Sequence, residues 1–433
     1  MDISEIVTTL NKWNFWNQEI ETGFYREGYF SRLKKYLKMP EIVAITGVRR
    51  CGKSTIVFQL IEYLIGSGVK PENTLYVNFE DPNFSGELDH LFLEKIFESY
   101  LEFYKPEGKI YLFLDEVQMV PGWEKFVASL YDRKVNVKIF VTGSSSGLLM
   151  SEISSLLAGR YVSEVIYPFS FREFLDYKGI GYAPLVRSTK LYGLLREYLE
   201  FGGFPRVVME AGNYEKKILL TEYFNSIVER DILLRHMIKN AKETKEIINF
   251  ALSNTAGQMS SYKLEKLTGV SSQSIRRYFE YFEESFLMHF APMFAYSVKK
   301  QIYNPQKVFA IDTGLASAVS FRFSRDTGKM MENLVAIELL RKGRELYYWQ
   351  DDLEVDFLLR DGHNVSELIN VCYSLNKESL DREIRSLQAG MEYFSGASAK
   401  VIYWEGKPPK EKDGIVFVNI LDFLLTDVAR SFL

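Results

Sequence analysis

A short glycine-containing segment between an apolar run and a helical pattern constrains this chain more than any other feature. Residues 47–54 read Gly-Val-Arg-Arg-Cys-Gly-Lys-Ser, which fits the spacing G-x-x-x-x-G-K-[ST]. Residues 41–46 before it predict a buried strand, and residues 53–65 after it predict a helix with one apolar face. In that context the glycines let backbone N–H groups turn inward, and the helix N-terminus favours negative charge. The segment therefore predicts a phosphate-binding loop.

The residues of this phosphate loop are expected to hold a nucleoside triphosphate. Lys53 is expected to contact the β- and γ-phosphates and to act in catalysis, and the Ser54 hydroxyl is expected to ligate Mg²⁺. Arg49 and Arg50 are expected to position the nucleotide. The predicted nucleotide-binding residues are Gly47, Val48, Arg49, Arg50, Cys51, Gly52, Lys53, Ser54 and Thr55, with Ser144 from a later turn.

Strand and helix patterns alternate after the loop. Apolar runs at residues 74–79, 110–114 and 138–142 predict strands, and residues 88–104 and 123–131 predict the helices between them. Such alternation is typical of a parallel sheet covered on both faces. The predicted fold class is therefore α/β, with a parallel sheet that carries the phosphate loop.

Two carboxylates follow the strand predicted at residues 110–114. Asp115 is expected to ligate Mg²⁺, and Glu116 is expected to act as the general base on water. The alternative is a solvated acidic turn, because acidic residues are common where strands end.

Three further side chains could serve the same reaction. Ser144 could sense the γ-phosphate or form an ordinary serine turn. Arg160 is the candidate catalytic arginine, acting in its own chain or a neighbouring one, and a structural ion pair is the equal alternative. Arg206 is a weaker candidate of the same kind.

Composition limits the class of protein. The chain has 433 residues, 47% of them hydrophobic, and a net charge of −4, so we expect several domains with real cores and no overall basic surface. Cys51 lies in the phosphate loop and Cys372 is the only other cysteine. A reducing cytoplasm is therefore the expected compartment. The sequence has neither a signal-peptide pattern nor an apolar run of roughly 18 residues. The histidines lack metal-ligand spacing.

Changes in character along the chain predict four domains. Residues 1–165 form the predicted phosphate-loop domain, with residues 1–40 as a lead-in. Residues 166–240 are mainly helical. Residues 241–325 and 326–433 form two further predicted domains.

The third predicted domain, residues 241–325, carries a helix-turn-helix pattern. Residues 245–257 and 262–268 predict helices, a glycine turn follows, and a third helix carries Arg276 and Arg277. Two strand patterns after it would complete a winged helix. The two arginines could contact DNA. Glutamates follow on the same helix, so a protein-contact module is an equal alternative.

The fourth predicted domain, residues 326–433, looks like the restriction-endonuclease fold. That fold works through an Asp and then a Glu-x-Lys on the next strand, where carboxylates hold Mg²⁺ and the lysine assists water attack. Asp356 is in place and Glu332 could join it, but Asn370 and Cys372 stand where the Glu and Lys are expected. We therefore expect a degenerate nuclease fold used for binding or scaffolding.

These motifs together resemble a prokaryotic, notably archaeal, group of AAA-superfamily P-loop ATPases whose C-terminal region is of uncharacterised function. The matching residues are 47–54, 78–81, 114–118 with Trp123, 142–145, 157–160, 168–174, 332–339 and 354–357. The resemblance implies ATP as the nucleotide, a small helical lid at residues 166–240 and a possible ring or other homo-oligomer.

Three functions fit this sequence. The first is an Mg²⁺-dependent ATPase whose nucleotide cycle repositions C-terminal binding domains against a partner such as DNA. The second is an ATP-gated nuclease, which Asn370 and Cys372 disfavour. The third is a slow nucleotide-dependent switch. The first is preferred because Lys53, Asp115 and Glu116 are all present.

Overall fold

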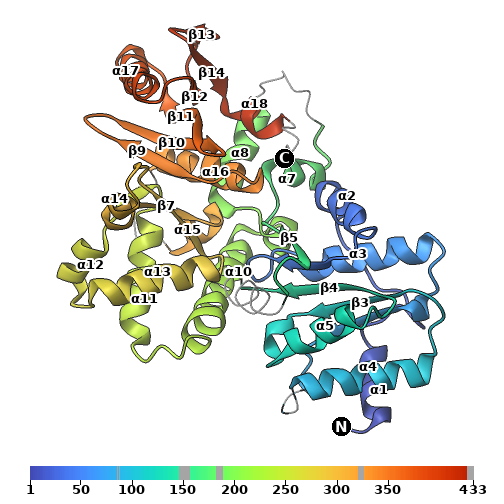
Figure 1. The fold of residues 1–433 in the computed structure, drawn as a ribbon. Helices are drawn as coiled ribbons and strands as arrows, with labels where there is room; N and C mark the ends of the chain where they lie inside the picture. The colour runs from blue at the N-terminus through green and yellow to red at the C-terminus, as the bar shows by residue number, and fades with distance from the viewer. Residues whose placement is uncertain (85, 87, 146–156, 182–188, 320–325, 427–433) are drawn as a thin grey trace. The chain divides into compact units, whose positions relative to one another are not determined.

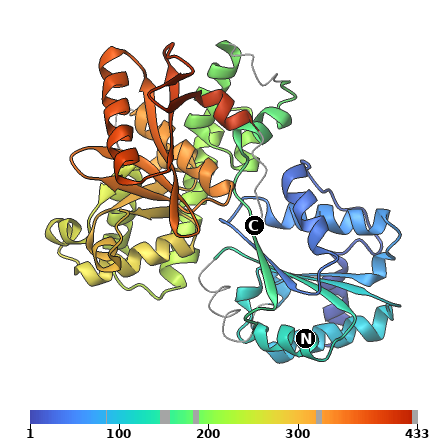
Figure 2. The ribbon, with the colours of Figure 1, turned by 45° about the horizontal axis from the view of Figure 1, so that its top comes forward.

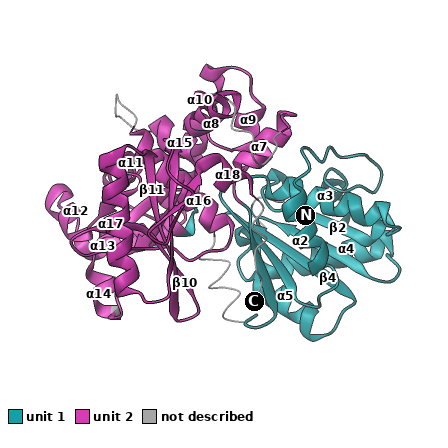
Figure 3. Cartoon of the chain, turned by 90° about the horizontal axis from the view of Figure 1, so that it is seen from above, with its two compact units in different colours: residues 1–166, 284–286 teal, residues 167–283, 287–433 magenta. Residues whose placement is uncertain are grey.

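The computed structural model describes residues 1–84, 86, 88–145, 157–181, 189–319 and 326–426 (Figure 1). The chain divides into two compact units (Figure 3). Unit 1 contains Met1–Ile166 and Glu284–Phe286, and unit 2 contains Tyr167–Glu283 and Leu287–Leu433. The division falls beside the boundary predicted after residue 165. The other three predicted domains lie in unit 2, apart from Ile166 and Glu284–Phe286.

Unit 1 contains a five-stranded sheet in which every neighbouring pair is parallel (Figure 2). In sheet order the strands are β2 (Thr74–Asn78), β3 (Ile110–Asp115), β4 (Val137–Gly143), β1 (Ile42–Thr46) and β5 (Tyr161–Val165). This confirms the predicted α/β class. Because parallel strands share a direction, their carboxyl ends meet at one edge of the sheet, which is where a ligand site is expected.

Helices cover both faces of this sheet. Alternate residues of each strand face opposite sides, so Ile42 and Ala44 join one core while Val43 and Ile45 face the other way. The helices that share the core of Ile42 and Ala44 are α1 (Ile3–Asn11), α4 (His90–Tyr104) and α5 (Trp123–Asp132). The helix α2 (Glu27–Tyr36) packs against α3 (Lys53–Gly66).

The strand β5 is not predicted by the sequence patterns. It pairs with β1 from Ile42↔Tyr161 to Thr46↔Val165. The apolar pattern is interrupted by Glu164, which is 1% exposed because Arg32 of α2 neutralises it at 2.9 Å. A buried ion pair of this kind cannot be recognised before the fold brings its partner.

Unit 2 begins with helices and continues with two sheets. Its helices before residue 240 are α7 (Phe171–Tyr177), α8 (Thr189–Phe201), α9 (Pro205–Met209) and α10 (Asn213–Ser226), followed by the π-helical segment Ile227–Leu234. The middle elements are α11 (Ala241–Ser253), β6 (Gly257–Met259), α12 (Ser261–Thr268), α13 (Ser272–Glu284), β7 (Met288–Pro292), α14 (Val298–Tyr303), β8 (Gln306–Ala310) and α15 (Thr313–Val319). The helix predicted to end at residue 257 ends at Ser253, because Gly257 pairs with Val308 in the antiparallel sheet β6-β8-β7.

A mixed six-stranded sheet, in the order β13-β14-β12-β11-β10-β9, forms the C-terminal part. Its elements are α16 (Thr327–Arg341), β9 (Tyr347–Gln350), β10 (Glu354–Asp361), β11 (Asn364–Ser374), α17 (Lys377–Tyr393), β12 (Ser398–Glu405), β13 (Glu411–Lys412), β14 (Ile415–Asn419) and α18 (Ile420–Leu425). The helix α16 begins at Thr327, earlier than the predicted Glu332, because the Asp326 side chain caps it. Among the residues described, no helix is long and apolar enough to cross a membrane.

The backbone of Gly203 connects segments of the helical part of unit 2 and joins that part to Asp312, in the segment before α15. The Gly203 N–H donates to Asp312 Oδ2 at 2.7 Å, and the Gly203 carbonyl accepts from the Phe169 N–H at 2.6 Å. A Cβ added at Gly203 would lie 2.1 Å from the Phe169 carbonyl oxygen, which cannot move away without losing that pairing.

We expect Gly203→Ala to destabilise unit 2 by about 2–4 kcal/mol, because the clash is with backbone. The matched control is Gly193→Ala in α8, where a new Cβ meets nothing within 4 Å. That change should stabilise the helix by up to about 1 kcal/mol. Urea unfolding of both variants measures the difference, and equal unfolding midpoints would contradict the predicted clash at Gly203.

Candidate nucleotide site

The phosphate loop connects the end of β1 to the start of α3. Gly47, Arg50 and Gly52 adopt positive φ angles of 147°, 70° and 102°. A Cβ on Gly47 would lie 2.2 Å from the carbonyl oxygen of Ile166, so only glycine fits there. The loop thereby leads its backbone to the N-terminus of α3, whose dipole favours an anion. This backbone fits a phosphate group.

Asp115, at the end of β3, is the centre of a buried hydrogen-bond network. Its Oδ2 atom accepts from the Ser54 hydroxyl at 2.8 Å and from the Tyr76 hydroxyl at 2.5 Å. Its Oδ1 atom accepts from the Thr142 hydroxyl. Burial, and then the neighbouring Glu116 carboxylate, raise the pKa of Asp115. The Ser54 hydroxyl and the Asp115 carboxylate are oxygen ligands of the type that Mg²⁺ prefers, so the residues fit that ion.

Lys53 and Glu116 form the charged part of the site. The Lys53 ammonium donates to the carbonyl oxygens of Gly47 at 3.1 Å and Val48 at 3.4 Å, and it lies 3.4 Å from Glu116 Oε1. Burial opposes the charge of Lys53, but Glu116 outweighs it and the pKa of Lys53 is raised. Burial also opposes the charge of Glu116, yet Lys53 and Arg49 lower its pKa to about 2. Glu116 therefore carries a negative charge at neutral pH.

Glu116 is held in a backbone conformation that few residues adopt. Its φ is 54°, and its N–H donates to the Thr142 hydroxyl at 3.0 Å. The Gln118 amide donates to the Glu116 carboxylate and lies 3.5 Å from the Ser144 hydroxyl. Ser144 thus lies at the same edge of the sheet as Glu116.

Four side chains of this site were given no role from sequence. Thr142 and Gln118 lie inside the motifs quoted above, so their position was a usable signal. Tyr76 and Arg26 have no such signal in the sequence. Tyr76 is a buried strand residue. Arg26 belongs to the lead-in, residues 1–40, and its guanidinium donates to the Cys51 carbonyl at 3.2 Å. Only the fold brings these two to the loop.

The other predicted loop residues have structural partners. Arg49 forms an ion pair with Glu80 at 2.5 Å, and Cys51 is fully buried. Thr55 follows Ser54 in the first turn of α3, and its Cγ2 atom lies 3.1 Å from a Cβ placed on Gly23. Of the two predicted positioning residues, Arg49 is therefore buried and held by Glu80, whereas Arg50 is exposed.

Arg160 does not join this site within the chain. It immediately precedes β5, whose first residue pairs with the first residue of β1, so it lies at the opposite end of the strands from the phosphate loop. Its guanidinium pairs with Asp132 at 2.7 Å. Any action on a transferred phosphoryl group would need a second copy of the chain.

The C-terminal candidates lie in unit 2. Asn370 is buried, and its amide donates to Glu383 at 2.7 Å and to Ser386 at 3.2 Å. Cys372 donates to the Ser374 carbonyl. Both positions of the missing Glu-x-Lys are therefore engaged in internal contacts.

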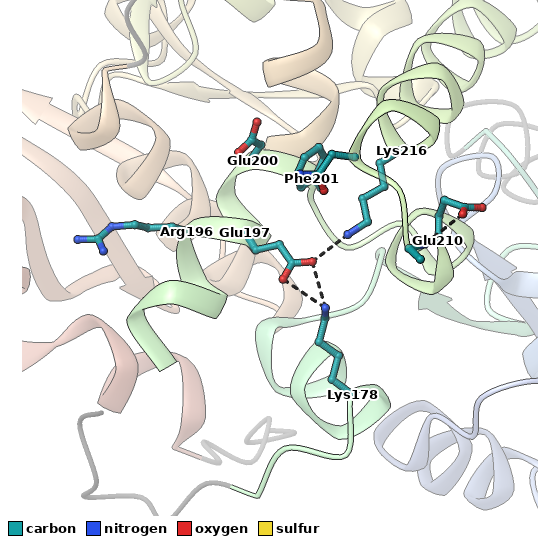
Figure 4. A pocket seen from close by; sticks show the side chains of 9 residues that line it. Lys178, Arg196, Glu197, Glu200, Phe201, Glu210 and Lys216 are labelled. Carbon is teal, nitrogen blue, oxygen red and sulfur yellow. Dashed lines mark hydrogen bonds and ion pairs between the residues drawn. The ribbon is translucent and has the colours of Figure 1, made fainter. Parts of the chain in front are cut away.

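A cavity of about 540 Å³ in unit 2 is lined by charged side chains, of which Lys178 and Lys216 both pair with Glu197 (Figure 4). The Glu197 carboxylate accepts from Lys178 at 3.0 Å and from Lys216 at 2.8 Å. Arg206 forms an ion pair with Glu210 of the same cavity at 3.2 Å. The cavity is lined by equal numbers of basic side chains (Lys178, Arg196 and Lys216) and acidic side chains (Glu197, Glu200 and Glu210).

The chain matches known families and relatives along most of its length. Residues 39–175 match the family described as AAA domain, and residues 192–326 and 327–423 match two domains of unknown function. An uncharacterised protein of Methanocaldococcus jannaschii is 35% identical, covering 81% of this chain and 79% of that protein. An uncharacterised protein of Haemophilus influenzae is 32% identical, and the match covers 92% of this chain and 98% of that protein.

The chain is a member of this AAA-domain family. The expected archaeal bias is only partly right, because the Haemophilus relative is bacterial. Among solved structures, the S. cerevisiae Hsp104–ADP complex is 15% identical with a TM-score of 0.30, covering 78% of this chain and 50% of that one. A DNA replication initiation factor is 16% identical with a TM-score of 0.25, and the match covers 62% of this chain and 87% of that one. These scores are too low to bear on partners or assembly.

We expect Tyr76→Phe to weaken Mg²⁺ binding in the AAA domain about tenfold, because outer hydrogen bonds orient a metal-binding carboxylate. Tyr111→Phe, at the other end of β3, is the control. Calorimetric titration of ATP at several Mg²⁺ concentrations measures the effect. An unchanged Mg²⁺ dependence in Tyr76→Phe would remove Tyr76 from the site.

Proposed function

We propose that the AAA domain binds ATP with Mg²⁺ at the phosphate loop and hydrolyses it. The observation that carries this proposal is the meeting of two pairs at one edge of the sheet. Ser54 Oγ lies 2.8 Å from Asp115 Oδ2, and Lys53 Nζ lies 3.4 Å from Glu116 Oε1. A hydroxyl beside a carboxylate can hold Mg²⁺, and the proposed hydrolysis of a phosphate bond also calls for a lysine and a carboxylate in this arrangement.

Each residue has a distinct role in this proposal. The loop residues Gly47–Thr55 bind the triphosphate, with Lys53 directed to its terminal phosphates. Ser54 and Asp115 hold Mg²⁺, which when bound neutralises charge developing on the phosphate oxygens. Ser144 contacts the terminal phosphate.

Glu116 acts as the general base in the proposed reaction. Without ligand its carboxylate is paired with Lys53, so it is not free to accept a proton from water. A bound triphosphate would compete with Glu116 for the Lys53 ammonium, because the triphosphate carries several negative charges and Glu116 carries one. The loss of that ion pair frees one Glu116 oxygen for water, while Gln118 and the Thr142 hydroxyl keep the residue in place.

The nucleotide cycle is proposed to reposition unit 2 through the chain segment after β5. The Ile166 N–H donates to the Thr46 carbonyl at 2.7 Å, beside Gly47. In unit 2, the next two residues are bound by Arg341 of α16, which donates to the Pro168 carbonyl at 2.8 Å and lies over the Tyr167 ring. A movement of the loop therefore acts on a segment that is anchored in unit 2.

The middle of unit 2 is proposed to be a winged helix that binds DNA, with a protein partner as the alternative. Support comes from the order α11-β6-α12-α13-β7-α14-β8 and the antiparallel sheet β6-β8-β7. The helix α12 ends at Gly269 with φ 74°, which makes the turn into α13. Arg277 is exposed, whereas Arg276 donates to Ser261 at 3.2 Å.

The C-terminal part of unit 2 is proposed to be a restriction-endonuclease-like domain without cleavage activity. The order α16-β9-β10-β11-α17-β12 supports the fold, with β11 antiparallel to β10 and parallel to β12. An ATP-gated nuclease is the alternative function, and a slow nucleotide-dependent switch is the other.

We expect Glu116→Gln to bind ATP normally and to reduce the rate of phosphate release by about 10²–10⁴, the usual worth of a general base. Steady-state phosphate release and ATP titration measure the two effects. Glu107→Gln, whose side chain is 81% exposed, is the control. Equal background rates in wild type and Glu116→Gln would favour the slow switch.

Arg277→Ala should weaken binding to duplex DNA and lower the salt dependence by about one counterion, because one phosphate contact is lost. Arg276→Ala should instead lower stability, because Arg276 also lies 5.2 Å from the centre of the Tyr303 ring. The charge-matched control is Lys412→Ala in β13. Gel shifts at several salt concentrations measure binding, and an unchanged salt slope in Arg277→Ala would exclude that contact.

A further inference from the structure

One buried lysine in unit 2 is surrounded by carboxylates. Lys307 of β8 is 2% exposed, and its ammonium lies 2.8 Å from Glu332 Oε1, 2.5 Å from Glu354 Oε1 and 2.9 Å from Asp356 Oδ1. The lysine belongs to the middle part of unit 2. Its partners belong to α16 and β10 of the C-terminal part, so the cluster forms only when the two parts pack.

The ammonium group is saturated by these contacts. It has three N–H donors, and three carboxylates surround it. The remaining oxygens of two carboxylates are also engaged: Asp356 Oδ2 accepts from the Val371 N–H and Glu354 Oε2 accepts from the Gln258 amide, both at 2.9 Å. The three lysine donors and these two carboxylate oxygens are thus paired without a further ligand.

Carboxylate oxygens are the donors that a divalent cation takes. With the ammonium between them, however, no group of three Asp, Glu, His or Cys side chains among the described residues is placed to hold a metal ion. We propose that the Lys307 ammonium occupies a three-carboxylate site in place of a divalent cation, so that unit 2 carries its own internal cation and takes up no metal there. The same ion pairs hold β8 against α16 and β10. This goes beyond the proposed function, since it does not depend on ATP binding or hydrolysis.

The physical reason for a lysine here is charge. Three carboxylates that are 12%, 34% and 17% exposed repel one another strongly unless a cation lies between them. Asn370 on β11 accepts a hydrogen bond from the Asp356 N–H on β10, and its amide adds no charge to the cluster. A lysine supplied by β8 stays beside the carboxylates, whereas a metal ion could dissociate. One ammonium does not neutralise all three, and burial together with Asp356 raises the pKa of Glu332 to about 8.

Removal of the ammonium should convert this cluster into a metal site. The probe is Tb³⁺, whose luminescence is excited by nearby aromatic rings; the Tyr348 ring lies 5.7 Å from the Lys307 ammonium. The full chain is titrated without nucleotide as wild type, Asp356→Asn, Lys307→Met and the double variant. Lys307→Met keeps the length of the side chain and removes its charge. Lys245→Met, from a half-exposed surface pair with Glu229, is the control.

Wild type and Asp356→Asn should give the same Tb³⁺ signal, because Tb³⁺ bound elsewhere, including at Asp115, is common to both. Lys307→Met should gain a signal with an affinity at least about tenfold higher than that of the double variant. Its melting temperature should fall without metal and recover with Mn²⁺, since the metal binds only the folded state.

Two results would overturn the proposal. One is a wild-type Tb³⁺ signal, or nicking of plasmid DNA with Mn²⁺, that Asp356→Asn removes, because the native cluster would then hold a metal. The other is a folded Lys307→Met that gains no Asp356-dependent signal. If Lys307→Met does not fold, the wild-type comparison with Asp356→Asn still decides, and Lys307→Arg should behave like wild type in it.

Discussion

The Asp115 carboxylate connects the elements on which the candidate site depends. It stands at the end of β3 and accepts hydrogen bonds from Tyr76 on β2, Thr142 on β4 and Ser54 on α3. Such a network is costly if any member is left unpaired, because a buried charge without partners loses its hydration. The strands and the helix after the phosphate loop are therefore fixed relative to one another before a ligand binds.

Unit 2 uses polar contacts in a similar way to join its parts. Asp312 is fully buried and accepts from the N–H groups of Gly203, Gly314 and Leu315, which fastens the helical part to the segment before α15. Burial raises the pKa of Asp312 to about 6, and these backbone hydrogen bonds oppose the rise. Lys307 makes the corresponding connection between the middle and C-terminal parts. The proposed repositioning of unit 2 would thus move a connected body.

Two buried lysines in this chain illustrate how geometry decides the use of a charge. Lys53 has one carboxylate at 3.4 Å and weak contacts to loop carbonyls, so phosphate groups can compete for it. Lys307 has three carboxylates within 2.9 Å and is nearly inaccessible. Both are almost completely buried, and burial alone would not distinguish them. The number and distance of their partners are the basis for proposing that Lys53 binds a ligand and that Lys307 is structural.

The sequence by itself determined the features that depend on neighbours along the chain. The spacing Gly47 to Ser54 between a strand and a helix, and carboxylates directly after an apolar strand, follow from local backbone chemistry. The α/β class followed from periodicity. The tertiary structure decided the features that join distant residues: β5 with its buried Glu164, the Tyr76 hydroxyl on Asp115, the position of Arg160 away from the loop, and Lys307 among its carboxylates. Local patterns cannot encode these features, because each joins residues far apart in the sequence. The buried charges of Glu164 and Lys307, in particular, are stable only beside partners that the fold supplies.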